Sequence, residues 1–495
     1  MTVGAAGLLA ACGSERPEAT PARRAVAVVD EIAIETSNES SWLTPGGQAM
    51  APLPGGGFAV VWSLGDFPRR DVAMQWLRDG GQTLLPPGGR IVAGAVEDEG
   101  GAVIVPHPHA GAFVAFERRH DDGAQVVVQS FDGEANPRWP ASGVAVADAR
   151  RWEYQSQPWL VADSLGGVFA CFEGRDDAGD PSIRSIRCQH LDATGHRTWG
   201  SLGIDVGGSA GVKAVPRAVD DGAGGLLVFW LNLRDLGGGQ PVLFEGQRFA
   251  PTGRQLWGSA GRVVHEALFA AQSYSLNDYG VIGDGRGGAI VVFRDVDRVP
   301  GNGVDLLAQR MSPEGSPLWG PGVVVAGGPR HQQHEATLAT MDGGVFVAAV
   351  SWGSDTAGSE IRLHRLTSDG GYLWPSGGVG LSNPAPGSSD WLTVAASDGR
   401  TLWVAWTHRA DPDNLWAVAM LTRLSAEGSP LDDGLELPLS KVPGGQFTQA
   451  LAVSPVSGHA LVVWADIRRT GTLAAPDIYG GLVRLVGVVD PAAVP

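Results

Sequence analysis

Charged side chains follow the apolar runs of a repeated unit, and they are the residues best suited to bind a ligand. These residues are Arg118, Arg119, Arg175, Asp176, Arg298, His408, Arg409, Asp411 and Arg468. Arginine forks suit carboxylates, so they predict a rim that docks a protein or a glycan. The alternative is that neighbouring Asp and Arg residues pair with each other, which contributes little to binding.

Hard oxygen ligands for a metal occur in one segment, where Asp295, Asp297 and Asp305 lie near Asn302. Calcium is the metal that prefers such oxygens. The spacing does not match the calcium loop of an EF-hand. We therefore expect no cofactor, with calcium at these three aspartates as the alternative.

Two histidine pairs are the other candidates for metal chemistry. His331 and His334 stand three apart before Glu335, between expected strands and not on a helix, which favours a surface loop. His107 and His109 would face the same side of an extended chain, but no third ligand suggests itself. No nucleophile elbow, phosphate loop or dinucleotide fingerprint occurs in a usable context, so we assign no catalytic residue.

The elements that position these side chains recur along the chain. Glycine-led apolar runs end at Trp62, Phe116, Phe172, Trp230 and Phe293, near Val350, and at Trp406 and Trp464. They are about 57 residues apart, too short for helices and rich in Val, Phe and Trp, which is typical of buried strands. Each run is followed by a strand that ends in a Gln-Arg-like pair.

A turn of fixed spacing then follows in four units, with glycine four residues before Trp199, Trp257, Trp319 and Trp374. We predict that these flat rings fill the wedge between neighbouring units. Two further short strands bring each unit to four.

Four-stranded units repeated in this way are typical of a β-propeller. The sequence predicts an all-β fold, a single propeller of eight four-stranded blades over residues 31–490, with a tail at 491–495. The segment around Ile32 and Ile34 matches a missing strand of the eighth unit, so the N-terminal strand is expected to close the ring. Seven blades are the alternative if one unit is degenerate.

The two rims of this propeller are expected to differ. The short Asp-Gly-Gly and Gly-x-x-x-Trp turns form what we call the regular rim. The polar segments between each apolar run and the Gln-Arg strand form the variable rim. Variable loops on a rigid scaffold usually carry binding sites, so the variable rim is the predicted working face.

The segment LDATGHRTW, with Thr194, Gly195 and Trp199, resembles the tryptophan-docking motif of eight-bladed PQQ-like propellers. That family includes quinoprotein dehydrogenases and a non-enzymatic outer-membrane lipoprotein. The whole repeat is more similar to uncharacterised propeller repeats of bacterial surface and secreted lipoproteins. The resemblance implies either a quinoprotein-like cofactor binder or a binding propeller of the cell envelope.

The N-terminus resembles the end of a bacterial lipoprotein signal, because Leu9-Ala10-Ala11-Cys12 fits the lipobox, although no Lys or Arg precedes Cys12. We expect a signal remnant over 1–12, lipid on Cys12 and a flexible tether over 13–30. Cys171 and Cys188 fall on neighbouring expected strands and form either a disulfide or two buried thiols. The expected location is extracytoplasmic, anchored to the envelope, most naturally the outer membrane, or secreted.

The formal charge of −17 repels phosphate backbones, so nucleic acid is not expected as a partner. Without a long apolar stretch, membrane contact is expected through the lipid anchor only, and we expect a monomer. Three functions follow: a non-enzymatic binding or scaffold propeller, a polysaccharide-active hydrolase or lyase, and a quinoprotein-like cofactor binder. The first is the main prediction.

Overall fold

The computed structural model describes residues 25–37, 39–44, 48–92, 97–148, 153–176, 184–234, 242–267, 279–296, 303–328, 331–352, 359–381, 394–397, 401–409, 416–431, 436–442, 444–472 and 474–487. Over these ranges every regular element is a β-strand. The described residues accordingly include no helix of the length and apolarity that crossing a bilayer requires. The chain is therefore all-β, as the sequence predicts.

The strands of the described residues form eight antiparallel units, the blades, which are numbered in chain order; blades 2 and 3 are joined in one sheet. Blade 1 is β3 (Met50–Pro52), β4 (Phe58–Leu64), β5 (Asp71–Leu77) and β6 (Arg90–Ile91), with β2 (Ser41–Trp42) beside β4. Blade 2 is β7 (Glu99–Pro106), β8 (Ala112–His120), β9 (Gly123–Phe131) and β10 (Val144–Ala145). Blade 3 is β11 (Glu153–Ala162), β12 (Val168–Asp176), β13 (Arg184–Leu191) and β14 (Ile204–Asp205). Blade 4 is β15 (Val212–Asp220), β16 (Leu226–Leu233), β17 (Val242–Phe249) and β18 (Arg262–Ala267).

The second half repeats this order. Blade 5 is β19 (Tyr279–Gly283), β20 (Ala289–Val296), β21 (Val304–Met311) and β22 (Val323–Ala326). Blade 6 is β23 (His331–Ala339), β24 (Val345–Trp352), β25 (Ser359–Leu366) and β26 (Val379–Gly380). Blade 7 is β27 (Val394–Ser397), β28 (Thr401–His408), β29 (Val418–Ser425) and β30 (Leu437–Pro438). Blade 8 is β31 (Gln446–Val453), β32 (Ala460–Asp466), β33 (Asp477–Gly487) and β1 (Ala25–Glu35).

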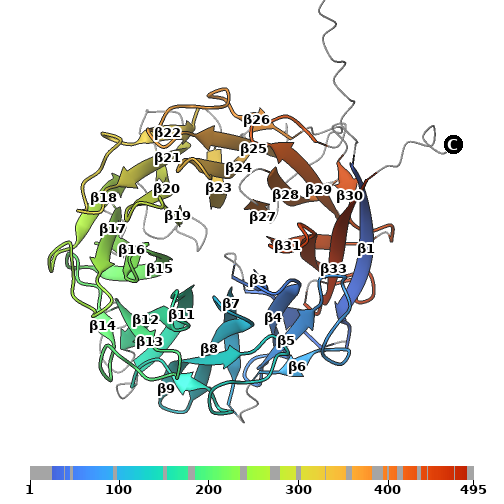
Figure 1. Ribbon diagram of the computed structural model, residues 1–495, viewed down its shortest axis with the longest axis horizontal. Helices are drawn as coiled ribbons and strands as arrows, with labels where there is room; N and C mark the ends of the chain where they lie inside the picture. Colours follow the sequence, from blue (N-terminus) through green and yellow to red (C-terminus); the bar gives the residue numbers. More distant parts are fainter. Residues whose placement is uncertain are drawn as a thin grey trace, which may run out of the picture.

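The blades stand around a central axis, with the first strand of each innermost (Figure 1). A single parallel bridge between Ala124 and Tyr154 joins the sheets of blades 2 and 3, which otherwise remain separate blades. Eight blades are thus observed, and the alternative of seven is excluded.

The N-terminal strand β1 is the outer strand of blade 8, where it runs antiparallel to β33 (Figure 1). This confirms the predicted origin of the last strand. The boundary differs, because Ala25 already pairs with Gly487 and the strand begins there and not at residue 31. Residues 25–30 of the expected tether therefore belong to the propeller, since their backbone groups find partners along β33.

The hydrophobic core lies between the blades, because each sheet buries both faces against its neighbours. The same holds where the ring meets itself: Phe58 and Trp62 of blade 1 share one cluster with Leu461 and Ile478 of blade 8. Four strands with two apolar faces cannot be stable alone, so stacking around the axis is what stabilises the repeat.

The predicted wedge tryptophans are buried, with Trp199, Trp257, Trp319 and Trp374 between 1% and 8% exposed. Each ring lies on the turn glycine of the next unit, where a Cβ would come within about 3 Å of the indole. The closest of these contacts, at 2.9 Å, are Trp257 on Gly315 and Trp374 on Gly428. The Trp257 indole N–H also donates to the carbonyl of Pro313 in that turn, at 2.9 Å. The rings therefore dock neighbouring blades, as predicted.

A buried glutamine holds the docking turn in each of blades 1 to 5, a role that no sequence pattern indicated. In blade 4, the Gln247 side-chain oxygen accepts the Trp257 backbone N–H at 3.0 Å, and its amide donates to the Gly258 carbonyl at 2.6 Å. Blade 1 uses Gln75 in the same way, with Leu85 in place of the tryptophan. The Gln of the Gln-Arg pair thus has a structural role.

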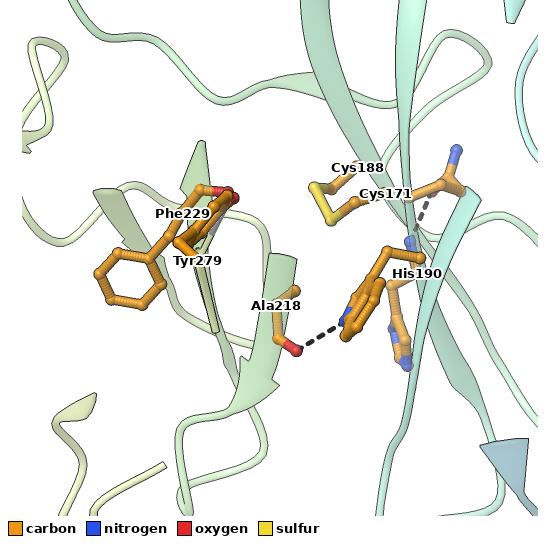
Figure 2. Close-up of a disulfide and its surroundings, with 8 residues drawn as sticks. Cys171, Cys188, His190, Ala218, Phe229 and Tyr279 are labelled. Atoms are coloured by element: carbon orange, nitrogen blue, oxygen red, sulfur yellow. Dashed lines mark hydrogen bonds between the residues drawn. A yellow bond between two sulfur atoms is a disulfide. The ribbon is translucent and has the colours of Figure 1, made fainter. Parts of the chain in front are cut away.

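The cystine joins β12 to β13, where Cys171 and Cys188 are paired in register. Of the two alternatives that the sequence left open, the structure has the disulfide and not two buried thiols. Figure 2 shows it beside the strands of blade 4, with Ala218 nearby. Both sulfurs are buried in the core cluster that blade 3 shares with blade 4, against Trp199 and Trp230. The bond therefore stiffens an interblade contact.

Candidate functional site

The regular rim is a structural surface. In its turns an aspartate such as Asp284 accepts the N–H groups of Arg286 and Gly288, and its second oxygen binds Arg310 at 2.8 Å. Arg310 in turn donates to the Ser368 carbonyl of the next unit. Charged groups here are used to cap turns and join blades, which leaves the variable rim as the candidate site.

Two predicted rim arginines lie at the variable-rim end of β8. The Arg118 guanidinium binds Glu99 at 2.8 Å and the Ser142 carbonyl at 3.1 Å. Arg119 lies 3.6 Å from Asp98 and 3.8 Å from Glu117 as ion pairs. The two arginines are consecutive in β8, so their side chains leave opposite faces of the sheet, each beside carboxylates.

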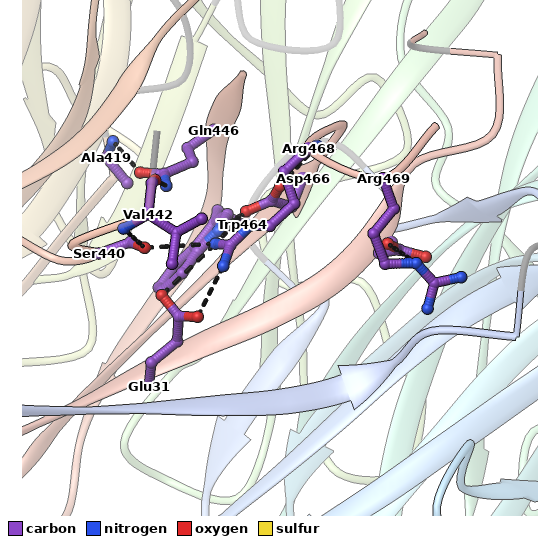
Figure 3. A network of polar contacts seen from close by, with 10 residues as sticks. Glu31, Ala419, Ser440, Val442, Gln446, Trp464, Asp466, Arg468 and Arg469 are labelled. Carbon is purple, nitrogen blue, oxygen red and sulfur yellow. Dashed lines mark hydrogen bonds and ion pairs between the residues drawn. The ribbon is translucent and has the colours of Figure 1, made fainter. Parts of the chain in front are cut away.

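Arg468, another predicted rim residue, belongs to a clamp on the N-terminal strand. Its guanidinium donates to Glu31 of β1 at 2.7 Å and pairs with Asp466, which also accepts the indole N–H of Trp464 at 2.9 Å (Figure 3). Arg469, beside it, pairs with Asp477 at 3.3 Å. These contacts hold β1 in blade 8, so the pairing interpretation holds for Arg468.

The remaining predicted rim residues are dispersed over other blades. Arg175 lies over the ring of Tyr154 at 5.3 Å, and the backbone of Asp176 pairs with Glu153 at the end of β12. His408 ends β28, with Arg409 directly after it, and both are half-buried. Arg298 and Asp411 lie outside the described residues, as does Cys12, the proposed lipid site.

The candidate metal aspartates are partly brought together. Asp295 and Asp305 are register partners in β20 and β21, and both are buried. Asp295 lies 2.9 Å from the His265 ring, and Asp305 accepts the Gly328 N–H at 3.2 Å. Asp297 lies outside the described residues. No group of three suitable metal ligands occurs in the described part of the chain.

The histidine pairs have structural positions. His334 lies in inner strand β23, 4% exposed, and its ring contacts Thr337 at 2.6 Å. The prediction of a surface loop is therefore wrong. An inner strand tolerates polar residues, and their pattern in the sequence resembles that of a loop. His107 accepts the His109 N–H at 3.2 Å and lies 2.8 Å from Arg138, so it caps a regular-rim turn beside a cation.

Residues that no sequence pattern singled out complete a site between blades 1 and 2. Arg70, just before β5, grips Asp98 with two hydrogen bonds of 2.9 and 2.7 Å. Asp98 is 5% exposed, and although burial opposes it, these bonds hold its pKa below the usual value. We call Phe67, Arg70, Asp98, Glu99, Glu117, Arg118 and Arg119 the blade 1–2 cluster.

The floor of this cluster is glycine. A Cβ on Gly100 would lie 2.9 Å from the Arg70 guanidinium carbon, and one on Gly101 would lie 3.0 Å from a Glu117 oxygen. Both glycines belong to inner strand β7, at an irregularity in its pairing with β8. The missing side chains let the charged groups reach the axis side of the sheet.

Two glutamates, the half-buried Glu117 and the buried Glu173, connect neighbouring blades near this cluster. Glu117 accepts the Gln157 N–H at 2.9 Å, and Glu173 accepts the Val215 N–H at 2.6 Å. Burial raises the pKa of both carboxyls, and the charge of Glu117 raises that of Glu173 further. Gln157 and Val215 have φ of 52° and 57°, a conformation uncommon for residues with a side chain.

Exposed aromatic rings concentrate on the variable rim. Among the described residues, Trp42 (44%), Phe67 (65%) and Trp416 (60%) are exposed there, whereas Tyr372 is the exposed ring of the regular rim. Phe67 has the guanidiniums of Arg70 and Arg119 each 5.6 Å from its centre. An exposed ring beside oriented cations offers both apolar and polar contacts to a ligand.

No family model matches the chain, and no curated protein matches it. Solved structures with a related fold include polysaccharide lyase Uly1 (10% identity, TM-score 0.43, 82% of this chain and 93% of that chain) and an ulvan lyase (12%, 0.42, 77% and 90%). An α-L-arabinanase of Penicillium chrysogenum complexed with arabinobiose is also similar (14%, 0.37, 69% and 94%). These likenesses are too distant to carry over an activity.

Proposed function

We propose that this chain is a non-enzymatic, extracytoplasmic binding propeller that docks a glycan on its variable rim. The observation that carries the proposal is that the side chains of the two rims are used differently. Polar groups of the regular rim cap turns and join blades, whereas the variable rim carries three exposed aromatic rings and the blade 1–2 cluster. Rigid scaffolds with such surfaces bind ligands.

The compartment is part of the proposal. A buried cystine forms and persists in oxidising surroundings, which supports a location outside the cytoplasm. The proposed lipid on Cys12 would tether the domain to the envelope, most naturally to the outer membrane. Mass spectrometry of the chain isolated from membranes would test for lipid on Cys12. In a second test, a Cys12→Ala variant should be released to the soluble fraction.

Glycan-array binding with alanine variants on both rims tests the function. Phe67→Ala and Trp416→Ala should weaken binding by about tenfold, because each removes an exposed ring of the variable rim. Leu165→Ala and Met341→Ala are matched controls, since these side chains are 82% and 74% exposed on the regular rim. Binding lost in the controls and kept in the variable-rim variants would refute the proposal.

A second function, hydrolysis or elimination of a polysaccharide, is favoured by one observation. Glu117 and Glu173 are carboxyls of neighbouring blades with raised pKa values, as general acids require. An enzyme would release new reducing ends from a bound glycan, and Glu117→Gln would abolish release without weakening binding. A bound glycan that stays intact over long incubation favours the binding propeller.

A further inference from the structure

The geometry points to a carboxylate-bearing polysaccharide as the ligand, held by Arg119 and Arg70 of the blade 1–2 cluster. This inference rests on the proposed glycan-binding function and adds the chemical class of the glycan.

Arg119 uses none of its guanidinium donors in a hydrogen bond to the described residues. Its nearest carboxylates are ion pairs at 3.6 Å and 3.8 Å, beyond hydrogen-bond distance. Its Nε is buried and has no partner among the described residues, and its side chain is 39% exposed. The exposed part of this guanidinium, and not its buried Nε, is what an incoming ligand oxygen can reach.

The guanidinium of Arg70 is also oriented to bind a ligand carboxylate. Its Nε and one terminal nitrogen are held by Asp98, which fixes the plane of the guanidinium. The other terminal nitrogen makes no hydrogen bond within the described residues and belongs to a side chain that is 26% exposed. A planar fork fixed by a buried carboxylate is suited to bidentate recognition of a second, incoming carboxylate.

The local charge favours an anion, although the whole chain is acidic. Three arginines of the cluster face three carboxyl groups, Asp98, Glu99 and Glu117. Burial, opposed by Arg118, raises the pKa of Glu99 to about 7, and burial raises the pKa of Glu117. Burial thus favours the uncharged form of two of the three carboxyl groups, which lessens their repulsion of an incoming anion in a chain of net charge −17.

A sugar polymer fits better than an acidic peptide because of the ring beside the arginines. Phe67 is 65% exposed and lies next to both guanidiniums. A flat apolar face can cover the C–H face of a sugar ring whose carboxylate reaches the arginines. Polyglutamate is the acidic polypeptide with which binding of the sugar polymer is to be compared.

The test is calorimetric binding of polygalacturonate, of the same polymer with its carboxylates methyl-esterified, and of neutral mannan. The full chain should bind polygalacturonate and lose about tenfold or more in affinity for the ester. Arg119→Gln should weaken polygalacturonate binding by about tenfold or more, and Arg119→Lys by less, because it keeps the charge and loses the fork. Arg254→Gln, an exposed arginine of the regular rim, is the matched control.

The outcomes separate the two proposals. If mannan binds as tightly as polygalacturonate, or if Arg119→Gln has no effect, the ligand class is wrong and glycan binding stands. If no glycan binds, the proposed function fails as well. Equal affinity for polyglutamate would replace the glycan by an acidic polypeptide. Unchanged urea midpoints of the variants would show that Arg119 acts on the ligand and not on folding.

Discussion

At the scale of single residues, Glu99 is the clearest source of pH dependence. It is fully buried, and among the described residues only one of its oxygens has a hydrogen-bond partner. Burial, opposed by Arg118, raises its pKa from 4.5 to about 7. The unfolded chain ionises this group first, so its favourable contribution is complete below pH 4.5 and is lost as pH rises through about 7.

The free energy of unfolding of Glu99→Gln, relative to that of the parent, should therefore rise from about pH 5 to about pH 8, by on the order of 1–3 kcal/mol. The amide keeps the shape and can still accept from Arg118. Urea unfolding at both pH values measures the difference. Glu134→Gln removes the same charge from an exposed side chain that does not act on Glu99, and it is the control. An equal pH response in both variants would contradict the assignment.

His364 is a second residue at which the repeat departs from its own rule. It occupies the place of the docking glutamine in blade 6, is 2% exposed, and neither ring nitrogen has a partner within the described residues. Burial, with Arg362 nearby, lowers its pKa from 6.5 to about 4. Its contribution is present above pH 6.5 and is lost as pH falls towards 4.

His364→Gln should restore the missing bonds to the Trp374 turn and remove this acid sensitivity. We expect a gain of about 1–3 kcal/mol near neutral pH and a larger gain at about pH 5. Thermal and urea unfolding measure both. The exposed His196→Gln is the matched control. A loss of stability at both pH values would mean that the blade 6 turn differs from the others.

At the scale of elements, the docking tryptophan sets how strongly two blades are joined. Trp257 is 1% exposed and combines ring packing on Gly315 with a hydrogen bond to Pro313. Trp257→Phe should cost about 1–3 kcal/mol, since it loses the N–H and part of the ring, and Trp257→Leu about 3–5 kcal/mol.

The same substitutions at Trp416, which is 60% exposed, provide the comparison and should change stability by less than about 0.5 kcal/mol. Denaturant midpoints with unchanged slopes would show that the blades still unfold together. Equal losses at both positions would show that burial between blades is not what Trp257 contributes.

At the scale of the whole molecule, the ring depends on β1. This strand covers the outer edge of β33, and Arg468 joins it to β32 through Glu31. A variant lacking residues 1–24 keeps β1 and should remain a stable monomer. A variant lacking residues 1–35 exposes the edge of β33, which is a template for pairing with other chains.

We therefore expect the longer deletion to aggregate or to unfold at a temperature lower by about 10 °C or more. Light scattering and calorimetry distinguish the two variants. If the deletion of residues 1–35 is as stable and monomeric as that of residues 1–24, the closing role of β1 is wrong. The variant lacking residues 1–24 should have the same unfolding temperature as the full chain.

Much of this architecture could be predicted because its signals are local and repeated. Turn glycines, apolar runs and tryptophans such as Trp257 recur at one spacing, and a period that is the same in most units needs no knowledge of distant contacts. The prediction failed at His331 and His334, which lie in inner strand β23 and not in a loop. Inner strands face the axis, where polar residues are tolerated, so their pattern resembles that of a loop.

The amino-acid sequence by itself determined the four-stranded repeat and the wedge role of the tryptophans, because each depends on neighbours within one unit or on a strict repeat. The tertiary structure decided between seven and eight blades, and between a disulfide and two free thiols at Cys171 and Cys188. Only the tertiary structure decided which charges on the variable rim are paired. Arg70 meets Asp98 from 28 residues away, and Arg468 meets Glu31 from 437 residues away. Such partners are set by the folding of separate strands onto one rim, and no local pattern encodes them.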